Sequence, residues 1–199
     1  EYRRDHLARQ RRVLQMTDAI AEQTGGVGPA DMAEILGDFH DPTGDRTRLA
    51  GRTIAAVHSI SSVVFEPEHR RIWVGSGHSP AARSWMVPFQ LAAADHPSRG
   101  GPDRSSTPFH PSPGWERTPH GQAFDLYRDA CVRKSEGESD KRLLILVEHA
   151  LALFPEDPSL HILAGLLALR SGRARRAEGA FRGALERLTD PPRRAEVTL

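Results

Sequence analysis

Few side chains in this 199-residue chain have the type and the spacing that nucleophilic catalysis requires. Cys131 is the one cysteine, but it lies in a predicted helix at a position typical of small packed residues, which indicates a structural role. Ser76 and Ser79 have no His and Asp arranged around them as in a serine-hydrolase triad. The glycines of residues 75–79 are typical of a phosphate loop, but the lysine and the helix of a Walker loop do not follow. We interpret residues 75–79 as the end of a strand.

Metal binding has two candidate signals in the sequence. Asp38, His40, Asp41 and Asp45 lie close together and could form an oxygen-rich metal site. The spacing lacks the central Gly and the bidentate Glu of a calcium loop, so we favour a loop with capping and turn carboxylates. The ten histidines include no His-x3-His pair of the kind that binds zinc on a helix. The sequence therefore predicts no metal and no cofactor.

One arginine cluster is a candidate binding surface. Arg173, Arg175 and Arg176 border the turn of a predicted helical hairpin. Such a cluster could bind an acidic peptide tail. It is also typical of a solvated helix start, which is the interpretation we favour.

Composition excludes several classes of protein. The 27 Lys and Arg residues balance 26 Asp and Glu residues, so the net charge of +1 gives no reason to expect nucleic-acid or membrane-surface binding. One cysteine permits no disulfide within the chain, and no apolar run approaches the roughly 20 residues that cross a bilayer. We expect a cytoplasmic protein. The first residues resemble the inside of a helix, so we expect the chain to be a piece of a longer protein.

Three zones differ in composition. Residues 1–94 form a mixed zone, residues 95–122 are rich in Pro and Gly, and residues 123–190 are helical, followed by a tail at 191–199. Proline fixes its own φ and disfavours helix at the preceding residue, so we expect the second zone to be an extended linker. Phe109 and Trp115 are its candidate anchors to a neighbouring domain.

The first zone predicts two helices followed by strands. Apolar residues recur at near-helical spacing before Gly25, and a shorter helix runs from Pro29 to Gly37. Residues 53–65 are rich in Ile, Val, Thr and Ser and predict a strand, which pairs with residues 71–75 as an antiparallel hairpin. Residues 85–89 predict a short edge strand. Because a lone hairpin is marginal in water, we expect this one to belong to a larger sheet.

The third zone contains an internal repeat of helix, turn and helix. Small residues and one aromatic recur at positions that resemble the tetratricopeptide repeat: Ala164, Gly165, Ala168, Ala177, Phe181 and Ala184. A weaker copy lies 34 residues upstream, which gives repeats at 124–157 and 158–191. The large aromatics of the family's first helix are replaced by His161 and Ala168. A pair of helical hairpins without repeat ancestry remains the alternative. Both interpretations predict the same core: Leu143, Leu144, Leu146, Val147, Leu151, Leu163, Leu166, Leu167, Phe181, Leu185 and Leu188.

The end of the first zone resembles a known enzyme family. Residues 35–41, 51–54, 59–67 and 70–77, followed by Ser79-Pro80 and Val87-Pro88-Phe89, look like the C-terminal end of the acyl-coenzyme A:6-aminopenicillanic acid acyltransferases, also called peptidase family C45. The resemblance implies a four-layer αββα N-terminal-nucleophile hydrolase. In that family a processed N-terminal cysteine attacks an amide or thioester carbonyl, and its α-amino group acts as the base.

The resemblance leaves the site of this chain open. Residue 1 is Glu, so the resemblance assigns no nucleophile here. Where related sequences often carry an Ile-Cys pair followed by Arg, this chain has Ile54-Ala55-Ala56. Arg52 and His58 are candidates to replace that arginine in the substrate pocket, although solvent-facing strand residues are the interpretation we favour.

We therefore expect an α+β protein: a partial αββα layer with a β-hairpin, linked to an all-α array of tetratricopeptide-like hairpins. The expected function is that of the C-terminal part of an acyltransferase or amide hydrolase acting on a small amide or thioester, with no activity in this chain alone. The repeats would bind a partner protein or peptide. The alternative is a non-catalytic interaction module or scaffold.

Overall fold

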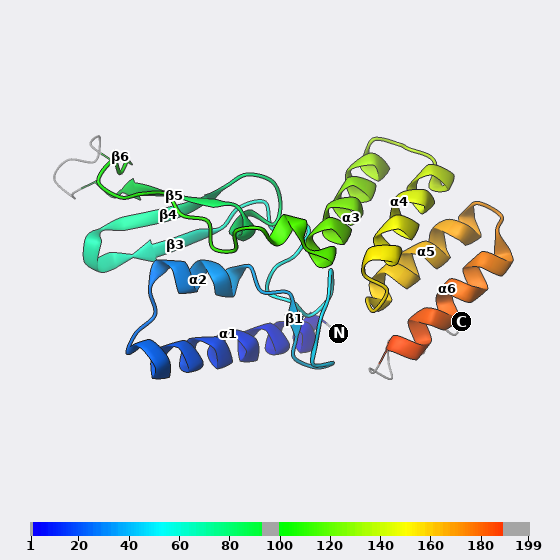
Figure 1. The fold of residues 1–199 in the computed structure, drawn as a ribbon, viewed down its shortest axis with the longest axis horizontal. Helices are drawn as coiled ribbons and strands as arrows, with labels where there is room; N and C mark the ends of the chain where they lie inside the picture. Colours follow the sequence, from blue (N-terminus) through cyan, green and yellow to red (C-terminus); the bar gives the residue numbers. More distant parts are fainter. Residues whose placement is uncertain (1, 93–99, 189–199) are drawn as a thin grey trace. The chain divides into compact units, whose positions relative to one another are not determined.

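The computed structural model describes residues 2–92 and 100–188, with side chains described from Asp5 onward (Figure 1). Residues 95–99 of the predicted linker, the end of the second repeat at 189–191 and the tail at 191–199 lie outside the described residues. The architecture is mixed α and β, as predicted, with helices and small antiparallel sheets. Among the described residues, no helix combines the length and the hydrophobicity needed to cross a membrane.

The chain divides into two compact units. Glu1–Thr43 with Arg52–Pro113 forms the first, which we name the sheet unit. Gly44–Gly51 with Gly114–Leu199 forms the second, which we name the helical unit. Two-residue strands β1 (His40–Asp41) and β2 (Arg46–Thr47) lie on either side of residues 42–45.

The sheet unit begins with the two predicted helices. Helix α1 (Tyr2–Thr24) ends before Gly25, whose φ of 77° suits glycine. Helix α2 (Pro29–Leu36) begins with Pro29 in its first turn, and the carboxylate of Asp31 accepts a hydrogen bond from the Gly28 N–H at 2.8 Å. Both predictions are confirmed, because the signals that start and stop these helices are local.

The predicted hairpin is also confirmed and belongs to a four-stranded antiparallel sheet in the order β3-β4-β5-β6. The strands are β3 (Val63–Glu66), β4 (Arg71–Ser76), β5 (Trp85–Gln90) and β6 (Gly101–Pro102), with 3-10 turns at Pro67–His69 and Ala81–Arg83. The expectation of an edge strand at 85–89 is wrong, since β5 pairs with both β4 and β6.

The first part of the predicted strand at 53–65 is irregular. The Thr53 hydroxyl donates to the Ala55 carbonyl at 2.6 Å, and the Ala55 N–H donates to the Asp38 carbonyl at 2.9 Å. A turn at Ala56–Ser59 follows. The β-branched composition predicts a strand, but these hydrogen bonds make the first part of the segment irregular, and the strand is limited to Val63–Glu66.

Helix α2 packs against one face of the sheet (Figure 1). The core of this contact consists of Ala33 from α2 with Val64, Trp73 and Met86 from the strands. Phe109 joins it: its ring centroid lies 5.0 Å from that of Trp73, and its backbone pairs with Met86. Residues 100–113 are therefore part of the sheet unit and not a separate linker between domains.

The remainder of the predicted linker belongs to the helical unit. A 3-10 turn at Trp115–Arg117 precedes α3 (Pro119–Ser135), and the Trp115 ring packs against Phe124 with centroids 5.7 Å apart. Gly121 permits the Trp115 backbone to lie close to α3, since an added Cβ would lie 2.1 Å from the Trp115 carbonyl oxygen. Phe109 and Trp115 thus anchor the two ends of this region within different units.

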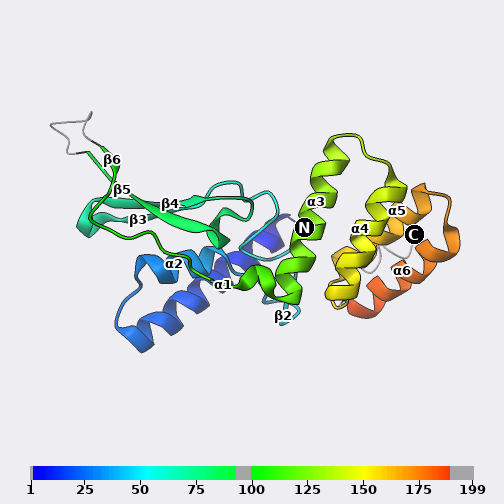
Figure 2. The same cartoon turned by 45° about the horizontal axis from the view of Figure 1, so that its top comes forward.

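The helical unit continues with α4 (Asp140–Leu153), α5 (Pro158–Arg170) and α6 (Ala174–Arg187). Figures 1 and 2 show each helix beside the next, in agreement with the contacts of α3 with α4, α4 with α5, and α5 with α6. Both ends of α6 lie 34 residues after the corresponding ends of α4, which matches the predicted spacing.

The core of the helical unit agrees in part with the predicted one. Leu143, Leu144 and Val147 are buried as expected. The fully buried Phe124 and Leu160 were not expected, and Leu166 is 47% exposed although it was expected in the core. Helix α5 is apolar on every side, so its periodicity does not identify the buried face.

Segment 44–51 is the main difference from the predicted boundaries, which place it with residues 1–94. The buried Asp157 caps α5 by accepting from the Ser159 N–H at 2.7 Å, and its other oxygen accepts from the Leu49 N–H. Arg48 donates to the Ser159 hydroxyl at 2.9 Å, and Arg46 donates to the Arg187 carbonyl at 2.9 Å. Leu49 is fully buried.

Candidate functional site

The two predicted pocket residues occupy different environments in the sheet unit. Arg52 is buried, 6% exposed, and its Nε lies 2.7 Å from the Asp5 carboxylate of α1. His58 is exposed in the Ala56–Ser59 turn. Neither residue lies in a strand. The interpretation of both as solvent-facing strand residues is therefore wrong, and for Arg52 also because its side chain is buried. Arg52 therefore holds its segment to α1 through an ion pair with Asp5, whereas the exposed His58 is accessible to a substrate.

The predicted arginine cluster surrounds the start of α6. Arg173 is the N-cap and is half-buried, while Arg175 and Arg176 are exposed. Arg176 is nonetheless paired, since its Nε lies 3.0 Å from the Glu148 carboxylate of α4. The exposed Arg175 is thus the most accessible member of the cluster for an acidic ligand.

The acidic loop after α2 does not form a metal cluster. Asp38 accepts from the Arg12 Nε at 2.8 Å, and the buried Asp41 accepts from the Thr43 N–H at 2.9 Å. Asp41 thus has the turn role that the sequence favours, whereas the ion pair of Asp38 with Arg12 was not predicted. Within residues 2–92 and 100–188, no group of three or more His, Cys, Asp or Glu side chains is placed to bind a metal ion.

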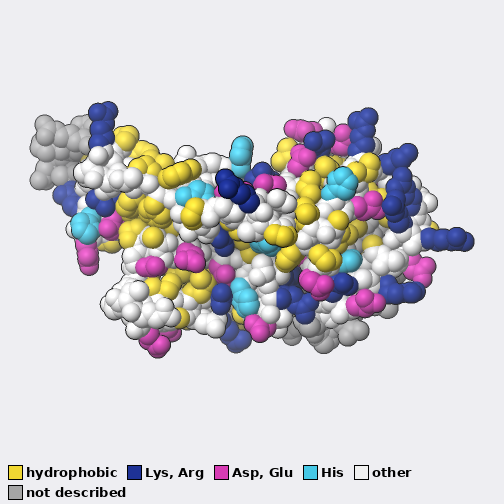
Figure 3. Space-filling model, in the orientation of Figure 1, with side chains coloured by type: hydrophobic (Ala, Val, Ile, Leu, Met, Phe, Trp, Pro, Cys, Tyr) yellow, Lys and Arg dark blue, Asp and Glu magenta, His cyan; other side chains and the backbone are white. Residues whose placement is uncertain are grey.

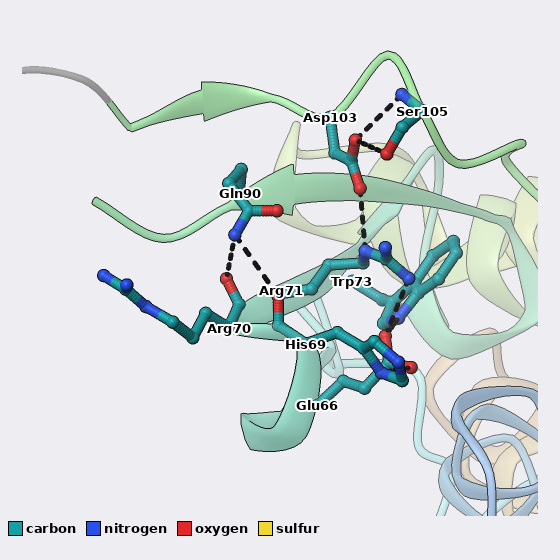
Figure 4. A network of polar contacts seen from close by, with 8 residues as sticks. All are labelled: Glu66, His69, Arg70, Arg71, Trp73, Gln90, Asp103 and Ser105. Carbon is teal, nitrogen blue, oxygen red and sulfur yellow. Dashed lines mark hydrogen bonds and ion pairs between the residues drawn. The ribbon is translucent and has the colours of Figure 1, made fainter. Parts of the chain in front are cut away.

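A network of hydrogen bonds and ion pairs lies at one end of the sheet (Figure 4). The Glu66 carboxylate accepts from the Trp73 indole N–H at 3.0 Å and from Arg71 at 3.0 Å, and His69 Nδ1 lies 2.9 Å away. Arg71 Nε also donates to Asp103 at 2.7 Å. The network therefore joins the end of β3 to β4 and to the residue that follows β6.

The protonation states of this network suit a structural role. Burial acts to raise the pKa of Glu66, but the Trp73 hydrogen bond and the charge of Arg71 outweigh it, so the pKa is lowered overall. Hydrogen bonds from the Ser105 hydroxyl and N–H lower the pKa of Asp103 to about 2. Carboxylates that stay ionised at neutral pH and are already paired are poor general acids or bases.

The helical unit contains a groove that the sequence analysis missed. It has a volume of about 340 Å³ and lies between α3, the start of α4, and α5. We name it the α3–α5 groove. Its walls are Ala130, Cys131, Leu143, Leu163, Leu166 and Leu167, with Lys134 and Arg170 at its border. One sequence feature could have indicated the groove: α5 is apolar on every side, and such a helix leaves some of its leucines outside the core.

Two cations of the groove share one carboxylate. Lys134 Nζ lies 2.6 Å and Arg170 Nε lies 3.1 Å from the two oxygens of Asp140. The hydrogen bond from Lys134 is the main cause of a lowered pKa at Asp140, so this carboxylate is charged at neutral pH. The three side chains together carry a net charge of +1 beside an otherwise apolar wall.

Cys131 in the groove wall is not an activated nucleophile. The thiol is half-buried, and burial raises its pKa, although a hydrogen bond with Tyr127 acts in the opposite direction. A raised pKa keeps the thiol protonated at neutral pH, whereas the thiolate is the reactive form. The structural role predicted for Cys131 is consistent with these surroundings.

The sheet carries an apolar face on the side opposite α2. Residues alternate between the two faces of a strand, so Val63, Phe65, Ile72, Val74, Trp85, Val87 and Phe89 share one face. We name these seven residues the outer face. Phe65 is 68% and Trp85 is 55% exposed. Figure 3 shows hydrophobic side chains gathered over the surface that β3, β4 and β5 form.

Comparison of the chain with protein-family models, with curated proteins and with solved structures gave no match.

Proposed function

We propose that the sheet unit is the C-terminal part of an N-terminal-nucleophile acyltransferase or amide hydrolase that resembles peptidase family C45. The substrate is an amide or thioester of a small acid. The helical unit is a tetratricopeptide-like region attached to this enzyme. The observation that carries the proposal is the outer face of the sheet.

The outer face supports the proposal through its hydrophobicity. A sheet with one solvated face alternates apolar and polar residues, but here the outer face is apolar although α2 already packs on Val64, Trp73 and Met86 of the opposite face. Contiguous exposed apolar patches mark surfaces that pack against something else. In an αββα sandwich, helices cover one face of each sheet and the second sheet covers the other. Helix α2 and the outer face correspond to these two sides.

The chemistry of such an enzyme needs a nucleophile that this chain does not supply. Its cysteine forms a covalent acyl intermediate, and backbone or side-chain donors stabilise the oxyanion. Cys131 lies in the helical unit with a raised pKa. The proposal therefore assigns the nucleophile to a segment of the parent protein outside these 199 residues, and it retains the exposed His58 as a candidate substrate contact.

The test uses the natural protein that contains these residues. It is treated with a cysteine-directed covalent inhibitor, the modified residue is identified by mass spectrometry, and hydrolysis of amide and thioester substrates is followed. We expect modification of a cysteine at a new N-terminus, with loss of hydrolysis in parallel. Modification of Cys131 alone, or turnover by the 199-residue chain alone, would refute the proposal.

A non-catalytic interaction module is the second candidate, and the surface of the helical unit favours it. Val132, Ile145 and Leu169 are each about half exposed, and Arg175 is exposed at the start of α6. Exposed apolar and arginine side chains are common in peptide-binding surfaces. Binding to an acidic peptide library should weaken in Arg175→Glu but not in Arg182→Glu, an exposed arginine further along α6. Equal weakening in both variants would indicate a non-specific charge effect and remove this candidate.

A further inference from the structure

The residues that line the α3–α5 groove all belong to the helical unit. We propose that the groove binds a medium-chain fatty acid, with the alkyl chain on the leucine wall and the carboxylate beside Lys134 and Arg170. The inference concerns the helical unit alone and does not require the proposed acyl chemistry. It rests on the lining of the groove, its charge and its size.

The lining of the groove suits an alkyl chain. The groove is lined by Leu163, Leu166 and Leu167 from α5 and by Ala130 and Cys131 from α3. Leu166 is 47% exposed, so the groove leaves apolar surface in contact with water. A bound alkyl chain would remove this surface from water and fill the groove without needing a hydrogen-bond partner in the wall.

The charge of the groove suits a single carboxylate. Lys134 and Arg170 contribute two positive charges, and Asp140 contributes one negative charge between them. The remaining charge of +1 is complementary to one anionic head group. Lys134 has three N–H donors and Arg170 has five, so both can bind a second carboxylate while they contact Asp140.

The size of the groove favours a small molecule over a folded partner. Its volume of about 340 Å³ lies at the lower end of the range typical of small-molecule pockets. A stable protein interface instead buries about 800 Å² on each partner. We therefore propose a fatty acid as the ligand, and preferential binding of a peptide in the groove would contradict the proposal.

The first experiment titrates the complete 199-residue chain with sodium decanoate, below its micelle concentration, by calorimetry. We expect saturable binding of one decanoate per chain. Leu166→Asp places a charge on the apolar wall and should weaken binding by about tenfold or more. Leu169→Asp is the matched control, because Leu169 is 55% exposed on the same helix but does not line the groove. Circular dichroism checks that both variants fold.

The second experiment separates the head group from the chain. Arg170→Gln should weaken decanoate binding by about threefold to tenfold and leave decanol binding within about twofold. Arg142→Gln, an exposed arginine on α4 that pairs with Glu138, should leave both unchanged. Salt at 0.5 M should weaken decanoate more than decanol.

Four results would overturn the inference. The first is no saturable binding of decanoate at concentrations up to 1 mM, on the order of the weakest useful affinity. The second is equal weakening in Leu166→Asp and Leu169→Asp. The third is binding of decanol that is as tight as decanoate in the wild type. The fourth is an amphipathic peptide that displaces decanoate competitively and binds more tightly. None of these results bears on whether the sheet unit belongs to an acyltransferase.

Discussion

The carboxylate of Asp157 accepts a hydrogen bond from the backbone N–H of Leu49, a residue 108 positions earlier in the chain. Both residues are fully buried. The other oxygen of Asp157 accepts from the Ser159 N–H at 2.7 Å, so the same side chain caps α5 and fixes segment 44–51. One carboxylate therefore joins a non-local segment to the start of the second predicted repeat.

Replacement of Asp157 by Ala should destabilise the helical unit strongly. The variant loses a helix cap, which costs about 1 kcal/mol, and leaves the buried Leu49 N–H without its acceptor, which costs about 1–3 kcal/mol. We expect a total loss of about 3 kcal/mol in the free energy of unfolding, measured with urea. The matched control is Ser139→Ala at the N-cap of α4, whose side chain makes no capping hydrogen bond. A similar loss in both variants would contradict the role given to Asp157.

Gly165 should not tolerate even one methyl group. A Cβ added there would lie 2.5 Å from Cε1 of Phe181, so α5 and α6 must separate or the ring must move. We expect Gly165→Ala to lower the free energy of unfolding by about 1 kcal/mol or more. Phe181→Leu in the same chain should recover part of the loss. Gly179→Ala has open space at an exposed position of α6 and should instead stabilise by up to about 1 kcal/mol. Stabilisation by both substitutions would show that the helices do not approach this closely.

Elements with local signals could be predicted from the sequence. Pro29 and Gly37 frame α2, and Gly172, with a φ of 73°, separates α5 from α6. The 34-residue spacing between α4 and α6 follows from small residues such as Ala150 and Ala184, both fully buried.

Features that depend on tertiary contacts could not be predicted. Residues 53–59 have the composition of a strand, yet the Ala55 N–H donates to the Asp38 carbonyl, and the Thr53 hydroxyl and the Ser59 N–H donate within the segment. The contact of Leu49 with Asp157 joins segments that are distant in the sequence, and no periodic pattern of residues predicts it. Beside the α3–α5 groove, Lys134 of α3 and Arg170 of α5 both form ion pairs with Asp140 of α4. The spacing of these residues along the sequence does not predict that they come together.

Asp103 should make stability depend on pH in the acid range. Hydrogen bonds from Ser105 lower the pKa of Asp103 in the folded state to about 2, whereas the pKa of an unfolded Asp is about 3.9. A carboxyl group whose pKa is lower in the folded state than in the unfolded state stabilises the fold at pH values above the unfolded pKa. This stabilisation is lost as the pH falls toward 2. The difference in unfolding free energy between wild type and Asp103→Asn should therefore be present at pH 5 and shrink by pH 2.5. Ser105→Ala should raise the Asp103 pKa in an NMR titration, and an unchanged titration would contradict the assignment.

Cys131 should react slowly with alkylating reagents. Burial raises the pKa of the thiol, so the thiolate fraction at pH 7.5 is smaller than that of a free cysteine. We expect iodoacetamide to modify the folded chain at least about tenfold more slowly than the chain in 8 M urea. Tyr127→Phe removes the hydrogen bond that lowers the thiol pKa and should slow the reaction further. Reaction of the folded chain at the rate of the unfolded one would show that Cys131 is freely accessible and not perturbed.

The outer face should control self-association of the isolated chain without supporting its stability. Phe65 and Trp85 are largely exposed, so the double variant Phe65→Thr/Trp85→Thr should change the free energy of unfolding by less than about 1 kcal/mol. The same variant should bind less of an apolar fluorescent dye and sediment as a smaller species, because apolar surface available for association has been removed. Ile60→Thr, at an 81% exposed position outside the strands, should change neither measurement. A stability loss as large as that of the core variant Val64→Ala would instead mean that the outer face is already covered within this chain, and the proposed second sheet would have nowhere to pack.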